Sequence, residues 1–346
     1  MTGASPITII GGGLAGLTLG IGLRAHNVPV TIHEAGRYPR HRVCGEFISG
    51  HGQATLARLG LRELLDQAGV ISAQTAAFFS ATRATAPRPL PSAAICISRF
   101  NLDAALAGRF RTLGGDLLES SRFAGDFAEG VIRATGRRAR AGTGGSQWFG
   151  LKIHARNVVL DAGLEMHLSA QGYVGLCKIS ADEVNICGLF RKMPGANSDA
   201  TGGRELLRGR PGSALHRRLA AAVFDEASFC AIAGLSLQPQ QAAVHAEICI
   251  GDTITMIPPV TGNGMSMAFE SAELAIAPLT AWSRGTCSWP EARQKIAREC
   301  DAVFARRLAW AKWMQRIILT PALQNPLLAL AARSDRFWRL AFERTR

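Results

Sequence analysis

The hydrophobic pattern of the first forty residues predicts a strand, a helix and a second strand. The β-branched apolar run at 7–10 predicts a short buried strand. The apolar stretch at 14–25 predicts a buried helix, and the run at 28–33 predicts another strand. Because this order is typical of a parallel βαβ unit, we expect the chain to begin as an α/β fold.

Period-two alternation of apolar and polar residues recurs in the middle of the chain. It is found at 148–155, 172–179 and 184–190, with a turn predicted at 181–183 between the last two segments. Alternation of this kind is typical of strands with one buried face. The three segments therefore predict an antiparallel sheet, distinct from the parallel unit at the start.

The remaining pattern predicts further helices, loops and one buried strand. These are helices at 52–68, 101–113 and 214–227, loops at 123–145 and 193–212, and a buried strand at 248–250. Asn101 is the predicted N-cap of the second of these helices. An amphipathic helix is predicted at 302–319, where apolar positions alternate with arginines.

Three glycines at GxGxxG spacing follow the first strand. Gly11 permits a tight turn, Gly13 lets the backbone approach a diphosphate, and Gly16 allows the helix to pack closely on the strand. The first helical residues, Leu14 and Ala15, present free amide groups to an anion. The segment predicts a dinucleotide-binding turn, with an incidental glycine-rich turn as the alternative.

The second strand ends in Glu34, eighteen residues after Gly16. A carboxylate here can accept both hydroxyls of an adenosine ribose, and it would repel a 2′-phosphate. The motif alone leaves open whether the dinucleotide is FAD or NAD.

The chain has 346 residues, of which 47% are hydrophobic and 19% are charged. That length accommodates about two domains of roughly 150 residues, each with a sizeable core. The composition excludes a disordered or fibrous protein.

The net charge is +13, and much of the excess lies near the C-terminus. The basic residues there are Arg298, Arg306, Arg307, Lys312, Arg316, Arg333, Arg336, Arg339, Arg344 and Arg346. They indicate either a solvated helix face or attraction to an acidic carrier protein or another anionic surface. No nucleic-acid-binding signature accompanies the charge, so nucleic acid is not an expected partner.

Eight cysteines are scattered along the chain with no CxxC pair and no histidine spacing typical of zinc. We therefore expect no metal site and a reducing, cytoplasmic setting. The N-terminus lacks the basic leader of a secretion signal, and the apolar stretch at 317–332 is interrupted by Pro321 and Pro326. No transmembrane segment is expected.

A second glycine-bearing turn follows the predicted strand at 248–250. Its residues include Gly251, Asp252, Pro258, Pro259, Gly262, Asn263, Gly264 and Met265. The turn resembles the second flavin-binding motif of the para-hydroxybenzoate hydroxylase superfamily, in particular its geranylgeranyl reductase-like branch. The resemblance implies that Asp252 contacts the ribityl chain and that a helix starts toward the flavin pyrimidine. The positive end of that helix dipole would stabilise a reduced, anionic flavin.

Other segments match the same branch in the same order along the chain. They are residues 38–47, 97–103, 150–154, 172–176 and 184–188. The resemblance implies that Arg42, Cys44 and Gly45 lie beside the isoalloxazine and that Arg99 lies near the cofactor. It covers most of the chain and implies FAD as the cofactor.

The two lines of inference together predict an extended set of cofactor-binding residues. They are Gly11, Gly13, Leu14, Ala15, Gly16, Glu34, Arg42, Arg99, Gly251, Asp252, Pro259, Gly262, Asn263, Gly264 and Met265.

The resemblance implies an α/β architecture in which a Rossmann-type (GR2-like) FAD-binding domain is interleaved with an antiparallel substrate-binding sheet. C-terminal helices complete it. The expected boundaries are 1–75, 93–170 and 245–285 for the FAD-binding domain, 76–92 and 171–244 for the substrate domain, and 286–346 for the helical region.

The chain departs from the family pattern at two places. The family's mid-chain Asp-Gly motif corresponds to Thr135 and Gly136 here, so its carboxylate is missing. NAD(P)H stays a candidate electron donor, but its direct use is in doubt. The preceding segment at 120–133 is also short, which indicates that strands have been trimmed from the first domain.

The candidate catalytic residues are Arg42, Cys44 and Glu46. Cys44 is either a reactive thiol near the flavin or a small packing residue. Glu46 is either an acid or base, or an anchor for the basic loop that contains Arg40 and Arg42.

The candidate substrate-pocket residues are Lys152, His154, Tyr173 and Pro258. Lys152 and His154 fall on one face of a strand, which is either the pocket face or the solvent face. Tyr173 can donate a hydrogen bond to a substrate carbonyl, stack on a ring or pack in the core.

The leading hypothesis is an FAD-dependent monooxygenase that hydroxylates an aromatic or polyketide-like small molecule through a flavin C4a-hydroperoxide. A flavin-dependent reductase of carbon–carbon double bonds is the first alternative, although the Tyr-x-Trp-x-Phe-Pro pocket motif of geranylgeranyl reductases is absent. A non-catalytic flavin-binding or carrier-docking protein is the second. In either enzyme the cofactor carries the reaction, and the protein orients the reactants.

Overall fold

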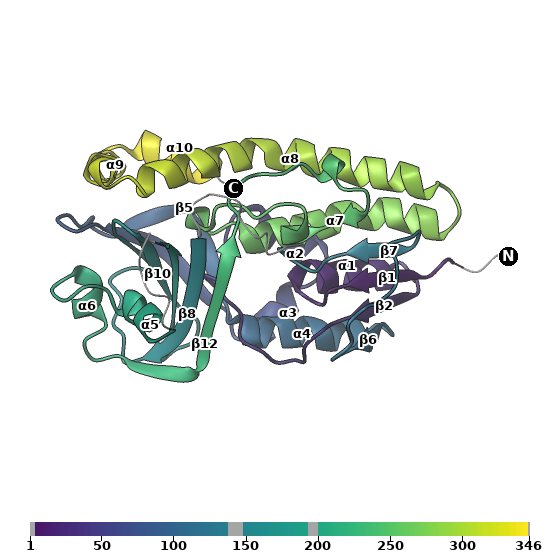
Figure 1. Ribbon diagram of the computed structural model, residues 1–346, viewed down its shortest axis with the longest axis horizontal. Coiled ribbons are helices and arrows are strands. Elements are labelled where there is room, and N and C mark those ends of the chain that lie inside the picture. The colour runs from purple at the N-terminus through teal and green to yellow at the C-terminus, as the bar shows by residue number, and fades with distance from the viewer. Residues whose placement is uncertain (1–3, 138–147, 193–199, 345–346) are drawn as a thin grey trace.

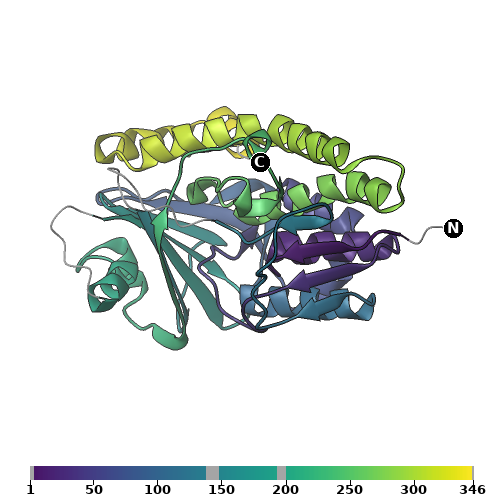
Figure 2. The ribbon, with the colours of Figure 1, turned by 45° about the vertical axis from the view of Figure 1, so that its right-hand side comes forward.

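Two β-sheets lie side by side beneath a layer of long helices (Figure 1, Figure 2). The computed structural model describes residues 4–137, 148–192 and 200–344. Parallel sheet A and the larger, curled sheet B are hydrogen-bonded separately, so the predicted α/β architecture with two sheets is confirmed.

Sheet A is parallel, with the strand order β13-β7-β1-β2-β6. Its strands are β1 (Ile7–Ile10), β2 (Val30–His33), β6 (Asp116–Leu118), β7 (Val131–Arg133) and β13 (Ile248–Cys249). The predicted strands at 7–10, 28–33 and 248–250 are confirmed within two residues. The short strands β6 and β7 were not predicted, because three residues are too few to show a period.

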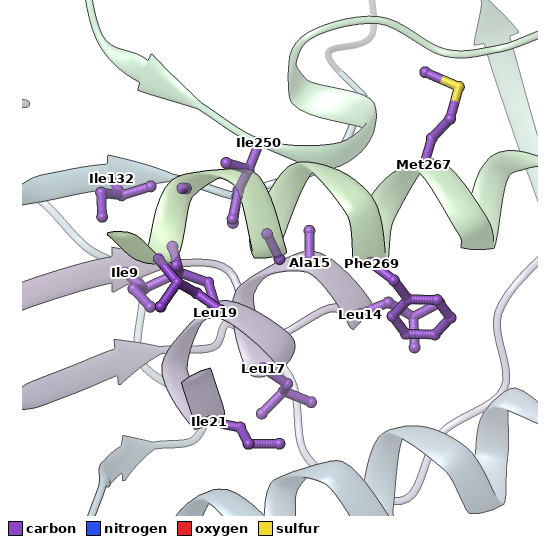
Figure 3. Close-up of a cluster of buried hydrophobic side chains, with 14 of the residues drawn as sticks. Ile9, Leu14, Ala15, Leu17, Leu19, Ile21, Ile132, Ile250, Met267 and Phe269 are labelled. Atoms are coloured by element: carbon purple, nitrogen blue, oxygen red, sulfur yellow. The ribbon is translucent and has the colours of Figure 1, made fainter. Parts of the chain in front are cut away.

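Helix α1 (Leu14–Ala25) is buried on nearly all sides, which explains its uniformly apolar sequence. It packs between sheet A, α4 (Arg99–Thr112) and α7 (Gly264–Ser283). Figure 3 shows Leu14, Leu17 and Leu19 of this helix among side chains of the strands and α7. The packing fixes where α1 begins, at the carboxyl edge of sheet A.

Sheet B has the strand order β12-β8-β11-β10-β9-β4-β5-β3 and is antiparallel except for the β4–β9 pair. Its strands are β3 (Phe47–Ile48), β4 (Ile71–Phe79), β5 (Arg88–Cys96), β8 (Trp148–Arg156), β9 (Leu164–Leu168), β10 (Gly172–Lys178), β11 (Glu183–Arg191) and β12 (Val223–Leu235). The three alternating segments predicted to form an antiparallel sheet are β8, β10 and β11, and they are confirmed.

The remaining helices are α2 (His51–Arg58), α3 (Arg62–Gln67), α5 (Ala200–Arg208), α6 (Ala214–Arg218), α8 (Trp289–Ile318), α9 (Pro321–Arg333) and α10 (Asp335–Arg344), with 3₁₀ turns η1 (Ala242–Val244), η2 (Gly251–Thr253) and η3 (Pro259–Thr261). Of these, α8, α9 and α10 form the upper layer in Figure 1. In the described part of the chain, no helix is long and apolar enough to cross a bilayer.

Two of the predicted helices were wrong in extent. The predicted helix at 52–68 is divided into α2 and α3, because Gly60 has a left-handed φ of 66°. The predicted helix at 214–227 ends at Arg218, and the chain enters β12 at Val223. Ser98 rather than Asn101 caps α4, since its hydroxyl accepts the Phe100 amide.

The two predicted loops also contain regular structure. The 123–145 segment holds β7, and its residues 138–145 lie outside the described part. The 193–212 segment holds α5, while 193–199 lie outside the described part. The domain boundaries stay a prediction, and strand pairing bears on two of the predicted segments. Strand β3 falls within 1–75, and β8 and β9 fall within 93–170, yet all three pair in sheet B.

Candidate active site

A cavity of about 1080 Å³ opens between the two sheets at the carboxyl edge of sheet A. Four parallel strands end there, and the residues that follow them line the cavity. They are Gly11 after β1, Glu34 after β2, Ala134 after β7 and Ile250 after β13. In open parallel sheets, ligands bind at this edge, outside the carboxyl ends of the strands.

The first glycine turn presents backbone rather than side chains to the cavity. Gly11 has a φ of 111°, which favours glycine, and it lines the cavity with Gly13, Leu14 and Ala15. A Cβ added at Gly13 would meet nothing within 4 Å, whereas one at Gly16 would lie 2.0 Å from the Gly11 carbonyl oxygen. Gly13 therefore leaves room for a ligand at the start of α1, and Gly16 serves close packing.

Glu34 is 5% exposed, and its carboxylate is held in place from several directions. One oxygen accepts the Gly12 amide at 2.9 Å and the other accepts the Gly36 amide at 2.8 Å. Arg40 lies 2.6 Å from Glu34, and Arg42 lies 3.6 Å away. Both arginines line the cavity, so the predicted ribose-binding acid lies beside cations that can contact phosphate.

The second glycine turn follows β13, the edge strand of sheet A, and lines the same cavity. Asp252, Gly262, Gly264 and Met265 line it, and α7 starts at Gly264. Pro259 also lines the cavity, whereas the buried Pro258 lies behind the turn, outside the lining. Two helix starts, those of α1 and α7, thus meet one cavity, and each provides free amide groups.

Two further predicted cofactor residues support this turn from behind. Gly251 has a φ of 62°, and its amide donates to Ser271 Oγ of α7 at 2.9 Å. Asn263 is fully buried, and its carbonyl accepts the Met267 amide at 3.0 Å. Neither residue lines the cavity, so both hold the turn in position.

Asp252 carries the carboxylate of the second turn. Burial raises the pKa of Asp252, and the guanidinium groups of Arg137 and Arg99 oppose that rise. A buried carboxylate that lines a cavity is stabilised by a hydroxyl donor. The ribityl chain of FAD supplies such hydroxyls, so Asp252 fits that group.

Arg99 is fixed at the start of α4 by a buried acid. Its guanidinium makes two bonds of 2.7 Å with the Asp103 carboxylate, and Arg42 lies 3.5 Å from the same carboxylate. Burial raises the pKa of Asp103, and the charge of Arg99 opposes the rise. Arg42 and Arg99 therefore line the cavity in fixed positions.

Cys44 lines the cavity, but its surroundings do not activate it. Its sulfur accepts the Glu46 amide at 3.4 Å. Burial raises the pKa of the Cys44 thiol, and only the charge of Arg99 and hydrogen bonds oppose it. Because a thiol with a raised pKa stays protonated, these facts favour the packing alternative over the reactive one.

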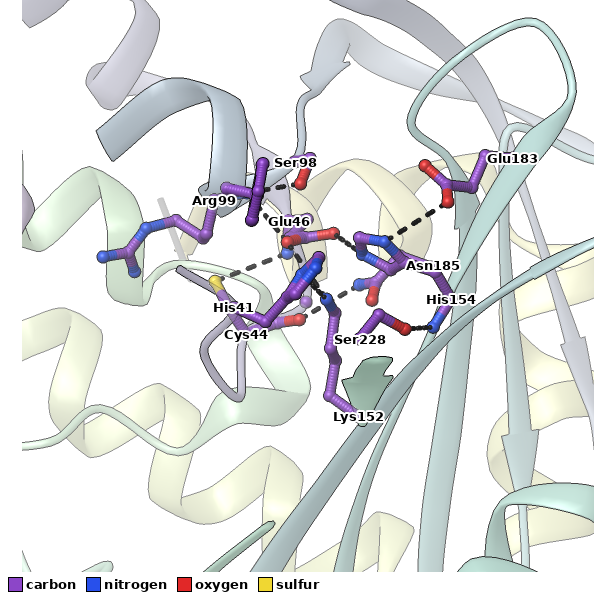
Figure 4. A network of polar contacts seen from close by, with 12 residues as sticks. His41, Cys44, Glu46, Ser98, Arg99, Lys152, His154, Glu183, Asn185 and Ser228 are labelled. Carbon is purple, nitrogen blue, oxygen red and sulfur yellow. Dashed lines mark hydrogen bonds and ion pairs between the residues drawn. The ribbon is translucent and has the colours of Figure 1, made fainter. Parts of the chain in front are cut away.

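Glu46 is the centre of a buried polar cluster, drawn in Figure 4. Its side chain is fully buried, and its backbone has a left-handed φ of 54°. One carboxylate oxygen accepts the Arg99 amide at 2.8 Å, and the other lies 2.8 Å from His154 Nε2. Lys152 Nζ lies 3.7 Å from the first oxygen.

Lys152 and His154 lie on one face of β8, as their spacing predicted, and that face is buried. They lie behind the cavity lining, where their side chains point to Glu46 and His41 (Figure 4). Lys152 Nζ lies 3.1 Å from His41 Nδ1. Burial, reinforced by the Lys152 charge, lowers the pKa of His41 to about 4.

His41 lines the cavity and was not predicted. The only local signal is its place in the basic segment 38–47, and its buried partner Lys152 lies 111 positions further along.

The end of the cavity next to sheet B and the C-terminal helices is apolar. It is lined by Phe78, Leu164, Met166, Leu189, Met314, Ile318, Trp338 and Phe342, among others. Tyr173 of β10 is 5% exposed and lines the cavity, and its hydroxyl has no hydrogen-bond partner among the described residues. A buried hydroxyl without a partner is costly, so this position calls for an acceptor on a ligand.

Thr135 lines the cavity where the family pattern has a carboxylate. The next residue, Gly136, donates its amide to Thr253 Oγ1 at 2.9 Å, which ties the end of β7 to the second turn. Among the described residues, no group of histidine, cysteine and acidic side chains has the geometry to hold a metal ion.

The comparisons with known proteins show the fold. No family model matches the chain, and no curated protein matches it in sequence. The fold is that of FAD-dependent monooxygenases and flavin-dependent halogenases, while the geranylgeranyl reductase-like branch is not confirmed.

Three solved structures illustrate the likeness. PqsL of Pseudomonas aeruginosa, in complex with 2-aminobenzoylacetate, has a TM-score of 0.72 and 16% identity over 95% of this chain and 100% of its own. The flavin-dependent brominase Bmp2 (triple mutant) has a TM-score of 0.70 and 18% identity over 97% of each chain. A flavoprotein/dehydrogenase from Cytophaga hutchinsonii has a TM-score of 0.76 and 13% identity over 98% of this chain and 92% of its own.

Proposed function

We propose that this chain is an FAD-dependent monooxygenase that hydroxylates an aromatic or polyketide-like small molecule. The observation that carries the proposal is that two glycine turns 240 residues apart meet an apolar chamber in one cavity. The fold that the chain shares with FAD-dependent monooxygenases supports it.

The residues around the cavity fit FAD along its whole length. Glu34 would bind the adenosine ribose, and the open space at Gly13 at the start of α1 would take the diphosphate. Asp252 would accept ribityl hydroxyls, and the start of α7 at Gly264 would face the flavin. When bound, the flavin takes up two electrons and uses oxygen to hydroxylate the substrate.

The protein's part in the reaction is to hold the substrate and exclude water. The apolar chamber desolvates a ring, and the Tyr173 hydroxyl would donate a hydrogen bond to a substrate carbonyl or ring oxygen. PqsL, with the same fold, was solved with 2-aminobenzoylacetate, an aromatic ketone-bearing molecule.

The electron donor is a separate part of the proposal. NAD(P)H is the donor we consider first, and Thr135 in place of a carboxylate argues against a family-type interaction with it. Mixing oxidised holoprotein with NADH or NADPH without oxygen, and following the loss of flavin absorbance, tests direct use. A bleached spectrum supports a pyridine nucleotide donor, and an unchanged one excludes it.

The reaction type is tested by turnover of reduced holoprotein with candidate aromatic substrates, with and without oxygen. We expect product only with oxygen, and mass spectrometry should find one atom from ¹⁸O₂ in it. Product formed from reduced enzyme without oxygen would remove the monooxygenase proposal and leave the reductase alternative. A purified protein without a flavin spectrum, even after incubation with FAD, would remove both.

We also propose a reducing, cytoplasmic setting and an acidic partner or another anionic surface. All eight cysteines are free thiols, which supports the setting. The exposed arginines of α8 and α10, such as Arg316, Arg336 and Arg339, support a basic contact surface. Binding to an acidic carrier protein that does not weaken as salt is added would count against this contact.

A further inference from the structure

A chain of acid–base groups runs from the cavity to the protein surface through sheet B. It consists of Glu46, which lines the cavity, His154 of β8, and Glu183 at the first position of β11. The imidazole of His154 lies between the two carboxylates, as Figure 4 shows. The three residues come from separate segments, so only the folded chain brings them together.

One link of this chain is a hydrogen bond, and the other is an ion pair that must shorten before a proton can pass. His154 Nε2 lies 2.8 Å from Glu46 Oε2, and His154 Nδ1 lies 3.6 Å from Glu183 Oε1. The His154 side chain is 2% exposed and that of Glu46 is fully buried, whereas the Glu183 side chain is 24% exposed. The chain therefore has one end in the cavity and the other in contact with solvent.

Packing alone does not account for this arrangement. Burying Glu46, His154 and Lys152 together carries a large desolvation penalty, and apolar residues of the same volume would fill the space at less cost. Glu46 also adopts a left-handed backbone conformation, which is unfavourable for a non-glycine residue. Such costs collect at functional sites.

We propose that Glu183, His154 and Glu46 form a proton relay that exchanges protons between solvent and the cavity. The inference rests on the proposed function, because flavin oxidation and reduction consume and release protons inside the cavity. Glu46 is the group at the cavity end, while His154 and Glu183 are positioning residues that connect it to solvent.

Each transfer in the relay leaves the His154 imidazole uncharged. A proton enters His154 at Nδ1 from Glu183 as the Nε2 proton leaves to the Glu46 carboxylate, so the imidazole ends neutral in its other tautomer. A flip of the imidazole ring then restores the first tautomer, and Glu183 takes its next proton from solvent, so that a second transfer can follow. Glu46 then holds the proton at the cavity wall.

Several groups packed around the relay influence its charge. They include His41 and Cys44 of segment 38–47 and the Lys152 ammonium of β8. From β12 they are Ser228, which accepts the His154 amide at 2.7 Å, and Asp225, whose carboxylate acts on His41. All of these stay unchanged when Glu183 alone is altered, so Glu183→Gln isolates the solvent end.

The direct test is hydrogen exchange at the His154 ring, measured by NMR on ¹⁵N-histidine-labelled protein without added FAD. In Glu183→Gln, we expect the His154 Nε2 proton to exchange with solvent about tenfold more slowly than in the wild type. Asp182→Asn removes a 72% exposed carboxylate from the same hairpin and is the matched control, which should exchange like the wild type.

Equal exchange rates in all three proteins, including exchange too fast to observe in all three, would overturn the relay. A resonance that is broadened in the wild type and sharp in Glu183→Gln is an expected result. This measurement needs no flavin, so it stands even if the proposed function fails on the FAD titration.

A second readout follows the holoprotein. The bound flavin is photoreduced and then mixed with oxygen. In this reaction FADH⁻, O₂ and H⁺ give FAD and H₂O₂, and two electrons pass from flavin to oxygen. In Glu183→Gln, we expect reoxidation to slow and to gain a larger effect of solvent deuterium, while Asp182→Asn behaves as the wild type. Unchanged rates and isotope effects in Glu183→Gln would show that protons reach the flavin by another way.

Discussion

At the scale of single residues, the two glycines of the first turn have opposite surroundings although they are three positions apart. Gly13 faces open space in the cavity, whereas Gly16 abuts the Gly11 carbonyl oxygen. A side chain at Gly13 would therefore occupy the ligand's place, and a side chain at Gly16 would collide with backbone. The two functions that the motif assigns to these glycines can be separated by experiment.

We predict that Gly13→Asp yields a folded protein that does not bind FAD, because the carboxylate would stand in the diphosphate position. The matched variant Gly16→Ala should instead lower the free energy of unfolding by about 3 kcal/mol, since its methyl group meets backbone. Flavin absorbance after FAD incubation and thermal unfolding of the apo-protein measure the two effects. A yellow Gly13→Asp protein would refute the diphosphate site.

The Asp252 carboxylate predicts a dependence of stability on pH. Burial raises its pKa above the unfolded value of 3.8, so the fold favours the protonated form. The apo wild type should therefore lose stability relative to Asp252→Asn as pH rises from about 4 through the raised pKa, and the difference should level off above it. Urea unfolding of both apo-proteins at a series of pH values measures it. A constant difference in stability across that range would contradict a raised pKa of Asp252 in the folded protein.

Residue by residue, the site was predictable where its signal is local. Gly11, Gly13 and Glu34 belong to one short motif whose spacing has a physical reason, and all three line one cavity. His41 and Phe342 had no such signal. His41 lines the cavity beside Lys152 of β8, and Phe342 lines it from α10, far along the chain. The spacing of Lys152 and His154 predicted a shared face but could not say that Glu46 lies against it.

At the scale of elements, the C-terminal layer depends on how α8 packs on α7. The buried positions Phe304, Leu308, Ala311, Gln315 and Ile318 alternate in steps of four and three along one face of α8. Arg307 joins that face and makes two hydrogen bonds to the Glu270 carboxylate of α7, at 2.7 and 2.5 Å. Both side chains are 8% exposed, so the pair lies inside the layer.

We predict that Glu270→Gln lowers the free energy of unfolding by about 3–5 kcal/mol, because Arg307 is left buried without an opposite charge. The double variant Glu270→Leu with Arg307→Met should be much closer to the wild type, since it removes both buried charges. Urea unfolding of the apo-proteins measures all of them. If the free energy of unfolding of Glu270→Gln lay within about 1 kcal/mol of the wild-type value, solvent would reach the pair.

Elements were predictable in proportion to their length and regularity. Helix α1 and strands β8, β10 and β11 have long, clear periods and were found within two residues. Strand β12 was partly assigned to a helix, because its half-exposed sequence lacks the alternation of its neighbours and its register is broken by irregularities. In that segment, pairing with β8 decides the structure and local preference does not.

At the scale of the whole molecule, the cavity exists because distant segments converge on the carboxyl edge of sheet A. The turn after β1 leads into α1 and the turn after β13 leads to α7, and these two helices pack on each other. Sheet B and α8, α9 and α10 then close the apolar end. A ligand that spans both turns is therefore bound by the assembled fold and not by one motif.

Because the two turns would bind different parts of one ligand, we predict that two variants affect FAD and ADP binding differently. Gly13→Asp should abolish binding of both FAD and ADP, because both carry the diphosphate. Asp252→Ala should weaken FAD binding by about tenfold, the loss of one or two hydrogen bonds, and leave ADP binding as in the wild type, since ADP lacks the ribityl chain. Calorimetric titration of each apo-protein with each ligand measures the four affinities. If Asp252→Ala weakened ADP as much as FAD, the variant would have disturbed the whole cavity. If it weakened neither, the two turns would not bind opposite ends of one dinucleotide.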